Sequence, residues 1–122
     1  MGENDLLDML AAETDRRAGT IIEGVEKLAG SGESDSAGVE ALREEAHGLK
    51  GAAMVVGQDR LGELAERLER FFAAHRESGR IELKEAAIAV AAVSSLDEGA
   101  KAAAEGSPEP PSVAQSLQRL VD

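Results

Sequence analysis

One short stretch, residues 46–53 (AHGLKGAA), brings together the residue types that could do chemistry in this chain. Within it, His47 is followed by Lys50 and Gly51, and residues three and four apart are neighbours on a helix. A neutral imidazole is a nucleophile near neutral pH, since its unperturbed pKa is about 6.5. Attack on a phosphoryl group would create a dianionic phosphoramidate, whose charge Lys50 is placed to stabilise. Gly51 leaves room for a partner to approach.

The helix that must position His47 has apolar residues at alternating spacings of three and four. These residues are Val39, Leu42, Ala46, Leu49, Ala53 and Val56. They define a buried seam, and at about 100° per residue His47 lies roughly 120° from the centre of that seam. Arg43, Lys50, Gly51 and Met54 share its side of the helix. The phase therefore predicts an exposed histidine rather than a core one, although an inert surface histidine fits the same phase.

The hydrophobic pattern predicts an all-α fold of four helices, over about residues 5–29, 36–56, 59–78 and 83–104. Asp35 or Ser36 can cap the second helix and Asp59 the third, while Gly57 suits a helix C-terminus. In the fourth helix alanine blurs the inward face. The residues expected there are Ala87, Ile88, Val90, Ala91 and Leu96. Short loops favour an antiparallel up-down four-helix bundle.

We divide the chain into a bundle, residues 1–104, and a Pro-containing tail, residues 105–122. No helix crosses the Gly- and Pro-rich segment 106–111 intact. Beyond it, residues 112–115 (SVAQ) have the form of a capping box that leads into Leu117, Leu120 and Val121. A short extra C-terminal helix that docks on the bundle or on a partner is one interpretation, and a partly ordered tail is the other.

Composition excludes several classes of function. The chain has 122 residues and a net charge of −11, so phosphates of nucleic acids would be repelled. It contains no cysteine, and therefore neither a disulfide framework nor a thiolate metal site. No apolar run reaches membrane-spanning length, and the first residues lack the pattern of a secretion signal. We expect a cytoplasmic protein with no nucleic-acid or membrane partner.

The stretch HGLKGAA at residues 47–53, with Gly57 ten residues after the histidine, resembles the signature of histidine-containing phosphotransfer (HPt) domains of multistep phosphorelays. Leu61, Leu64, Leu68 and Glu69 continue the family's spacing into the following helix. The resemblance is closest over residues 39–72.

Two residues depart from the pattern of that family. Val55 stands where many members carry a small polar residue. Glu66 stands where the phosphotransfer domain of chemotaxis kinases tends to have a second histidine.

The resemblance implies a phosphorelay intermediate. His47 would accept a phosphoryl group from a phospho-aspartyl receiver domain, or from a kinase, and pass it to the aspartate of a response-regulator receiver. Lys50 would stabilise the phosphoryl charge, and Glu69 would orient the imidazole through its other nitrogen, unless it is merely a solvated helix residue. The residues expected to form a partner-docking surface are Arg43, Gly48, Gly51 and Met54.

The resemblance also implies a phosphocarrier without an ATP site of its own, rather than an enzyme. The chain would hold no cofactor and no metal, because the Mg²⁺ and the reacting aspartates belong to the receiver domains. The expected partners are response-regulator receiver domains and a sensor histidine kinase, and we expect a monomer.

Four other interpretations compete with this one. A kinase dimerisation helix pair normally has an acidic residue directly after the histidine and a proline soon after, but here Gly48 follows and the first proline is Pro108. A metal site is disfavoured because His47 and His75 are 28 residues apart, and His75 suits the negative end of the third helix. A non-transferring module that binds receiver domains is the serious alternative, and the N-terminal phosphotransfer domain of a chemotaxis-type kinase is another.

Overall fold

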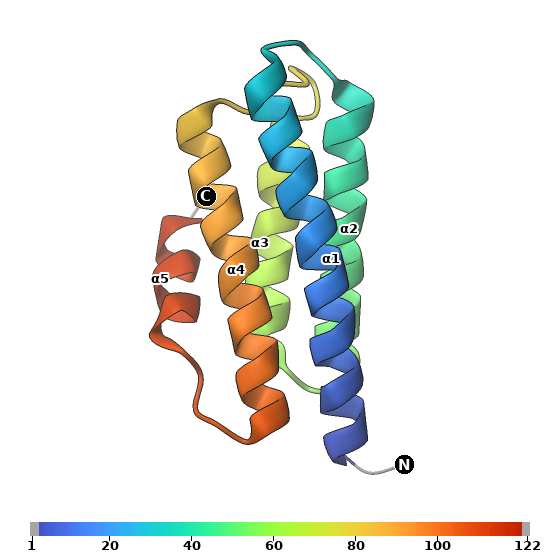
Figure 1. Cartoon of the computed structure of the whole chain (residues 1–122), viewed down its shortest axis with the longest axis vertical. Coiled ribbons are helices and arrows are strands. Elements are labelled where there is room, and N and C mark those ends of the chain that lie inside the picture. The colour runs from blue at the N-terminus through green and yellow to red at the C-terminus, as the bar shows by residue number, and fades with distance from the viewer. Residues whose placement is uncertain (1–2, 121–122) are drawn as a thin grey trace.

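The computed structural model describes residues 3–120. Five helices follow one another in this part of the chain: α1 (Glu3–Ser31), α2 (Ser36–Val55), α3 (Asp59–His75), α4 (Leu83–Glu105) and α5 (Pro111–Arg119). Helices α1 to α4 run alternately up and down, and α5 turns back beside α4 (Figure 1). This arrangement confirms the predicted four-helix bundle with a short extra C-terminal helix. Helix α1 extends two residues further at each end than its pattern indicated.

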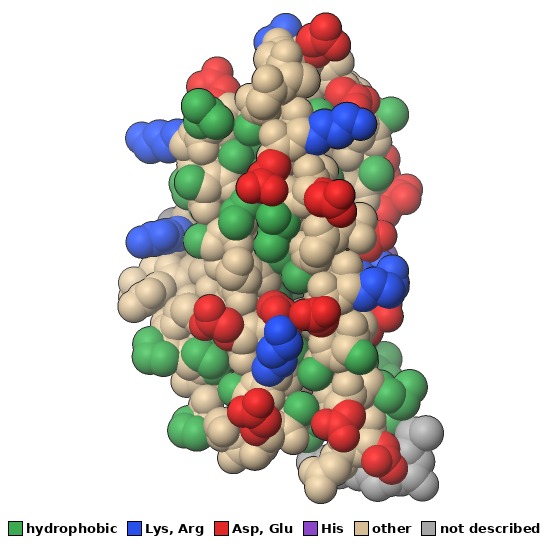
Figure 2. Space-filling view, viewed as in Figure 1, with side chains coloured by type: hydrophobic (Ala, Val, Ile, Leu, Met, Phe, Trp, Pro, Cys, Tyr) green, Lys and Arg blue, Asp and Glu red, His purple; other side chains and the backbone are tan. Residues whose placement is uncertain are grey.

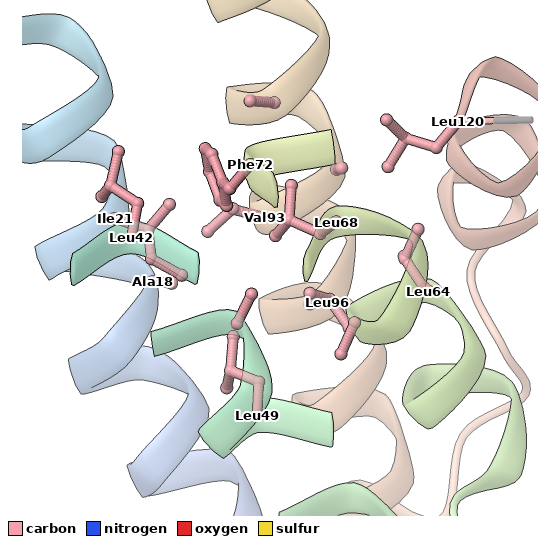
Figure 3. Close-up of a cluster of buried hydrophobic side chains, with 14 of the residues drawn as sticks. Ala18, Ile21, Leu42, Leu49, Leu64, Leu68, Phe72, Val93, Leu96 and Leu120 are labelled. Atoms are coloured by element: carbon pink, nitrogen blue, oxygen red, sulfur yellow. The ribbon is translucent and has the colours of Figure 1, made fainter. Parts of the chain in front are cut away.

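The core is aliphatic and draws on all five helices. Figure 3 shows Ile21, Leu49, Leu68 and Val93 from α1 to α4 converging on one interior, with Phe72 among them. The predicted seam of α2 is correct from Val39 to Ala53, where its residues are buried, whereas Val56 follows the end of the helix and is half-buried against the core. Of the two phenylalanines, Phe72 is fully buried, whereas Phe71 is half-buried and meets its ring edge to face. Burial of this apolar surface, at roughly 25 cal/mol per Å², is the main force that holds the helices together.

A tight connection joins α2 to α3 and makes them antiparallel neighbours. Gly57 has a φ of 74°, a left-handed conformation that favours glycine, and the Gln58 amide donates to the Ala53 carbonyl at 2.9 Å. The expectation that Asp59 caps α3 was wrong: Gln58 is the cap residue and makes no side-chain capping bond, and Asp59 is the first helical residue. Its carboxylate still lies at the positive end of the helix dipole.

The α1–α2 and α3–α4 loops, at the other end of the bundle, are hydrogen-bonded to each other. Asp35 accepts from the Gly38 amide at 2.9 Å and caps α2, and its own amide donates to the Gly79 carbonyl at 2.8 Å. Gly79 has a φ of 69°, and a Cβ there would stand 2.7 Å from the Asp35 nitrogen. Helix α3 therefore ends at His75, earlier than expected, because the chain must turn to meet the α1–α2 loop.

The inward face predicted for α4 was partly wrong. Ala87 is exposed and Ala91 is only half-buried. Ile88 and Val90 are half-buried and pack against the core, and Leu96 is buried as expected. The residues that α4 buries are Ala86, Ala89, Ala92, Val93, Ser95, Leu96, Gly99, Ala100 and Ala102. Because nine of its 23 residues are alanine, the two faces of this helix differ little in hydrophobicity, and packing decides which of them is buried.

Helix α5 docks on the bundle, against α3 and α4. Val113, Leu117 and Leu120 are buried there, while Val121 lies outside the described residues. The expected capping box was wrong: α5 begins at Pro111, where the missing amide hydrogen has no consequence, and the Ser112 hydroxyl donates to Glu98 of α4 at 2.9 Å.

Figure 2 shows the face formed by α1 and α4, over which acidic side chains are scattered, and no histidine is in view. Among residues 3–120, no helix combines the length and the apolar character that a membrane crossing requires.

Candidate functional site

His47 lies in the middle of α2 and points away from the core. Its side chain is 66% exposed, whereas its neighbours Ala46 and Leu49 are buried in the seam. The exposed position is the one that the helical phase predicted. The imidazole is therefore accessible to another macromolecule.

The His47 ring is held by Glu69 of α3. Its Nδ1 lies 3.1 Å from Glu69 Oε2, and Arg43 Nη1 donates to the same oxygen at 2.9 Å. An oxygen that accepts from a guanidinium acts as an acceptor towards the ring as well, which assigns the proton of the neutral imidazole to Nδ1. The Nε2 lone pair is then available for nucleophilic attack.

Arg43 was expected in the docking surface, but in the structure its guanidinium is hydrogen-bonded to acids of the domain itself. Its side chain is only 23% exposed, and it donates two hydrogen bonds of 2.8 Å to Glu40 in addition to the one to Glu69. Arg76 donates to Glu40 from the end of α3, and hydrogen bonds from Arg43 and Arg76 lower the pKa of Glu40 to about 2. This network holds the Glu69 carboxylate in position, and it engages the guanidinium of Arg43 in hydrogen bonds within the domain.

Lys50 lies one turn after His47 on α2, and it too faces an acid of α3. Its Nζ is 3.6 Å from Glu66 Oε1, an oxygen to which Arg70 Nη2 donates at 3.1 Å. The lysine side chain is 31% exposed. The ammonium group is thus close to the histidine along the helix and has a carboxylate partner across the helix pair.

The three other residues expected in the docking surface have different surroundings. A Cβ on Gly51 would meet nothing within 4 Å, so the surface is open there. A Cβ on Gly48 would stand 2.4 Å from Arg17 Nη1, because the Arg17 guanidinium of α1 lies over this glycine. Met54 is 45% exposed and packs over Gly62 of α3.

An apolar hollow extends from Gly51 along the junction of α1 and α2. Its lining residues are Leu6, Met9, Leu10, Glu13, Gly51, Ala52, Val55 and Val56. Met9 and Val55 are the most exposed of its large hydrophobic side chains, at 58% and 84%. An exposed apolar surface of this kind marks a site where a macromolecule can bind.

Sequence reasoning missed Arg17, Glu40 and the pairing of Glu66. The short connection between α2 and α3 could have predicted Glu40 and the pairing of Glu66. Because this connection is short, a step along α2 is matched by the same step backwards along α3, which pairs Glu40 with Arg76, His47 with Glu69 and Lys50 with Glu66. The position of Arg17 depends on the packing of α1, for which the local pattern gives no register.

His75 lies away from the candidate site and joins α3 to α4. Its Nδ1 is 2.8 Å from the Phe71 carbonyl and its Nε2 is 2.7 Å from Glu85, so the protonated ring donates to both. Burial lowers the pKa of His75, but the bonds to Phe71 and Glu85 outweigh it and the pKa is raised. His75 fits a structural role at the helix end. Among residues 3–120, no three histidine or acidic side chains are grouped so that they could hold a metal ion.

Comparison with known families identifies the architecture and the chemistry together. The family model described as the Hpt domain matches residues 5–121, which is essentially the whole chain and includes α5. A comparison with curated proteins gives no match. Hpt domains carry out histidine phosphotransfer in phosphorelays, and they interact with receiver domains and kinases of two-component systems. The chain belongs to the Hpt domain family, the histidine-containing phosphotransfer domains of two-component signalling.

Proposed function

We propose that this domain is a phosphorelay intermediate whose phosphoacceptor is His47. It takes a phosphoryl group from a phospho-aspartyl receiver domain, or from a kinase, and passes it to the aspartate of a response-regulator receiver. One observation carries the proposal: the imidazole is 66% exposed while its Nδ1 is held 3.1 Å from the Glu69 carboxylate. A ring held in this way presents Nε2 to a partner in a fixed orientation, and transfer depends mainly on such positioning.

The transfer needs no separate base. The Nε2 lone pair forms a bond to phosphorus, the P–O bond of the aspartyl phosphate breaks, and its electron pair leaves on the partner's carboxylate. The proton stays on Nδ1, so the phosphorylated ring carries a positive charge that Glu69 stabilises at hydrogen-bond distance. The same steps in reverse return the group to a second aspartate.

Lys50 and the docking surface have separate roles in this proposal. The ammonium group of Lys50, one turn from the histidine, stabilises charge on the phosphoryl oxygens in the transition state. Gly51 and Met54, together with the apolar hollow at the α1–α2 junction, receive the partner domain, which at Gly48 meets the Arg17 guanidinium that lies over this glycine. Arg43 donates a hydrogen bond to Glu69, and it is therefore a positioning residue for the carboxylate that orients the His47 ring. The chain itself supplies no nucleotide or metal, and Mg²⁺ belongs to the receiver domain.

Incubation with a panel of phosphorylated receiver domains tests the proposal. We expect an acid-labile, base-stable phosphate on the wild-type protein, its loss in His47→Gln and its retention in His75→Gln. Receiver binding without any label would instead indicate a non-transferring binding module. Label that comes only from a chemotaxis-type kinase, and from no receiver, would indicate the phosphotransfer domain of such a kinase.

A further inference from the structure

Glu66 is an acidic residue at the candidate site that the transfer mechanism does not use. It lies on α3, one turn before Glu69, and its Oε1 is shared by two cations. Arg70 Nη2 donates to this oxygen at 3.1 Å, and Lys50 Nζ lies 3.6 Å from it. The lysine that a phosphoryl group on His47 would require is therefore already paired with a carboxylate.

The antiparallel register of α2 and α3 places the two acids opposite two different groups. Glu69 faces His47 and orients the ring, whereas Glu66 faces Lys50. Glu66 is 33% exposed and Lys50 is 31% exposed, so both side chains are partly solvated and free to change partners. An ion pair of this kind is weak enough to be exchanged for another anion.

We propose that Glu66 is a positioning residue that competes with the phosphoryl group for Lys50. In the unphosphorylated protein it holds the ammonium group. When a dianionic phosphoryl group reaches His47, Lys50 leaves Glu66 for the phosphoryl oxygens, and Arg70 remains to neutralise the carboxylate. Glu66 thereby lowers the fraction of His47 that is phosphorylated at equilibrium and slows phosphorylation. The inference rests on the proposed function of His47 and Lys50.

The substitution Glu66→Gln removes the competing charge and preserves the shape of the side chain. Because partly exposed ion pairs contribute little, we expect phosphorylation to become about two- to fivefold faster. The donor is phosphoramidate, a small molecule that needs no docking surface. Phosphoramidate reacts as its zwitterion, in which the nitrogen carries three protons. The Nε2–P bond forms, the P–N bond breaks, and its electron pair leaves on that nitrogen as neutral ammonia.

Glu63→Gln is a matched control on the same helix. Glu63 accepts from Arg67 at 2.9 Å four residues later, as Glu66 accepts from Arg70, whereas the ammonium group of Lys50 pairs with Glu66. Both variants lose one negative charge and one pair within the helix. A faster reaction in Glu63→Gln as well would assign the effect to net charge and overturn the proposal.

A double-mutant cycle with Lys50→Ala tests whether Glu66 acts through the lysine. Under the proposal, Glu66→Gln accelerates the reaction in the wild-type background and has no effect when Lys50 is alanine. An equal acceleration in both backgrounds would show direct repulsion of the phosphoryl group, and no acceleration in either would show a purely structural pair. Both results would overturn the proposal while leaving His47 as the acceptor. Failure of the wild-type protein to label on His47 would overturn the proposed function as well.

Discussion

Replacement of Gly51 by leucine should raise the stability of the domain and impair transfer from receiver domains. Gly51 lies inside α2, and a Cβ there would touch nothing within 4 Å, so a side chain can start from this position without a clash at Cβ. Leucine is better than glycine in a helix interior by about 0.8 kcal/mol. With an unfolding entropy of about 2.1 cal/mol/K per residue over 122 residues, the gain corresponds to a rise in Tm of about 3 °C.

The same side chain would stand one turn from His47, at the edge of the apolar hollow. A partner held away by about 1 Å can lose roughly a hundredfold in rate, so we expect receiver-dependent transfer to fall at least tenfold. Phosphorylation by phosphoramidate should stay normal, because a small donor does not dock.

Gly19→Leu is the matched control for Gly51→Leu. Gly19 is an exposed glycine within α1 where a Cβ would likewise meet nothing within 4 Å, and it does not line the hollow. It should give a similar rise in Tm by calorimetry with unchanged transfer. Unchanged receiver affinity and transfer rate in Gly51→Leu would refute the assignment of the docking surface.

Three further predictions concern the residues around the site and at the helix end. Lys50→Ala should slow phosphotransfer by about tenfold or more in single-turnover assays, and Lys50→Arg should retain part of the rate. A wild-type rate in the alanine variant would show that the lysine is only a solvated charge. Glu69→Gln should slow transfer by about tenfold, because Nδ1–H loses a charged acceptor, and a wild-type rate would exclude an orienting role. His75→Gln should be less stable than wild type below pH 6.5, the ordinary pKa of histidine. Because the folded pKa of His75 is raised, this difference should shrink as the pH rises past that value in urea titrations, and a difference independent of pH would contradict the pairing with Glu85.

The features that local periodicity governs were predictable from the sequence. The seam of α2 contains leucine and valine at regular spacings with charged residues between them, so the exposed phase of His47 followed directly. The bundle followed from four helical segments joined by short loops. In α4, by contrast, neighbouring alanines give little difference in hydrophobicity between faces, and tertiary packing decides which of them are buried.

Long-range pairs were harder to predict. Glu69 was found through a family resemblance, whereas the pairing of Lys50 with Glu66 requires the register of the α2–α3 hairpin. Docking of α5 depends on whether Val113 and Leu117 can pack against α3 and α4, a property of the assembled bundle rather than of nine helical residues.

The central claim is that His47 carries the phosphoryl group on Nε2, and NMR of the phosphorylated protein tests it most directly. Phosphorus–nitrogen correlations on ¹⁵N-labelled protein, phosphorylated by a receiver domain, identify the nitrogen that is bonded to phosphorus. We predict one phosphorylated ring, that of His47, bonded at Nε2 with its proton on Nδ1 facing Glu69. Phosphorus on Nδ1 of His47, on His75 or on a carboxylate would contradict the account.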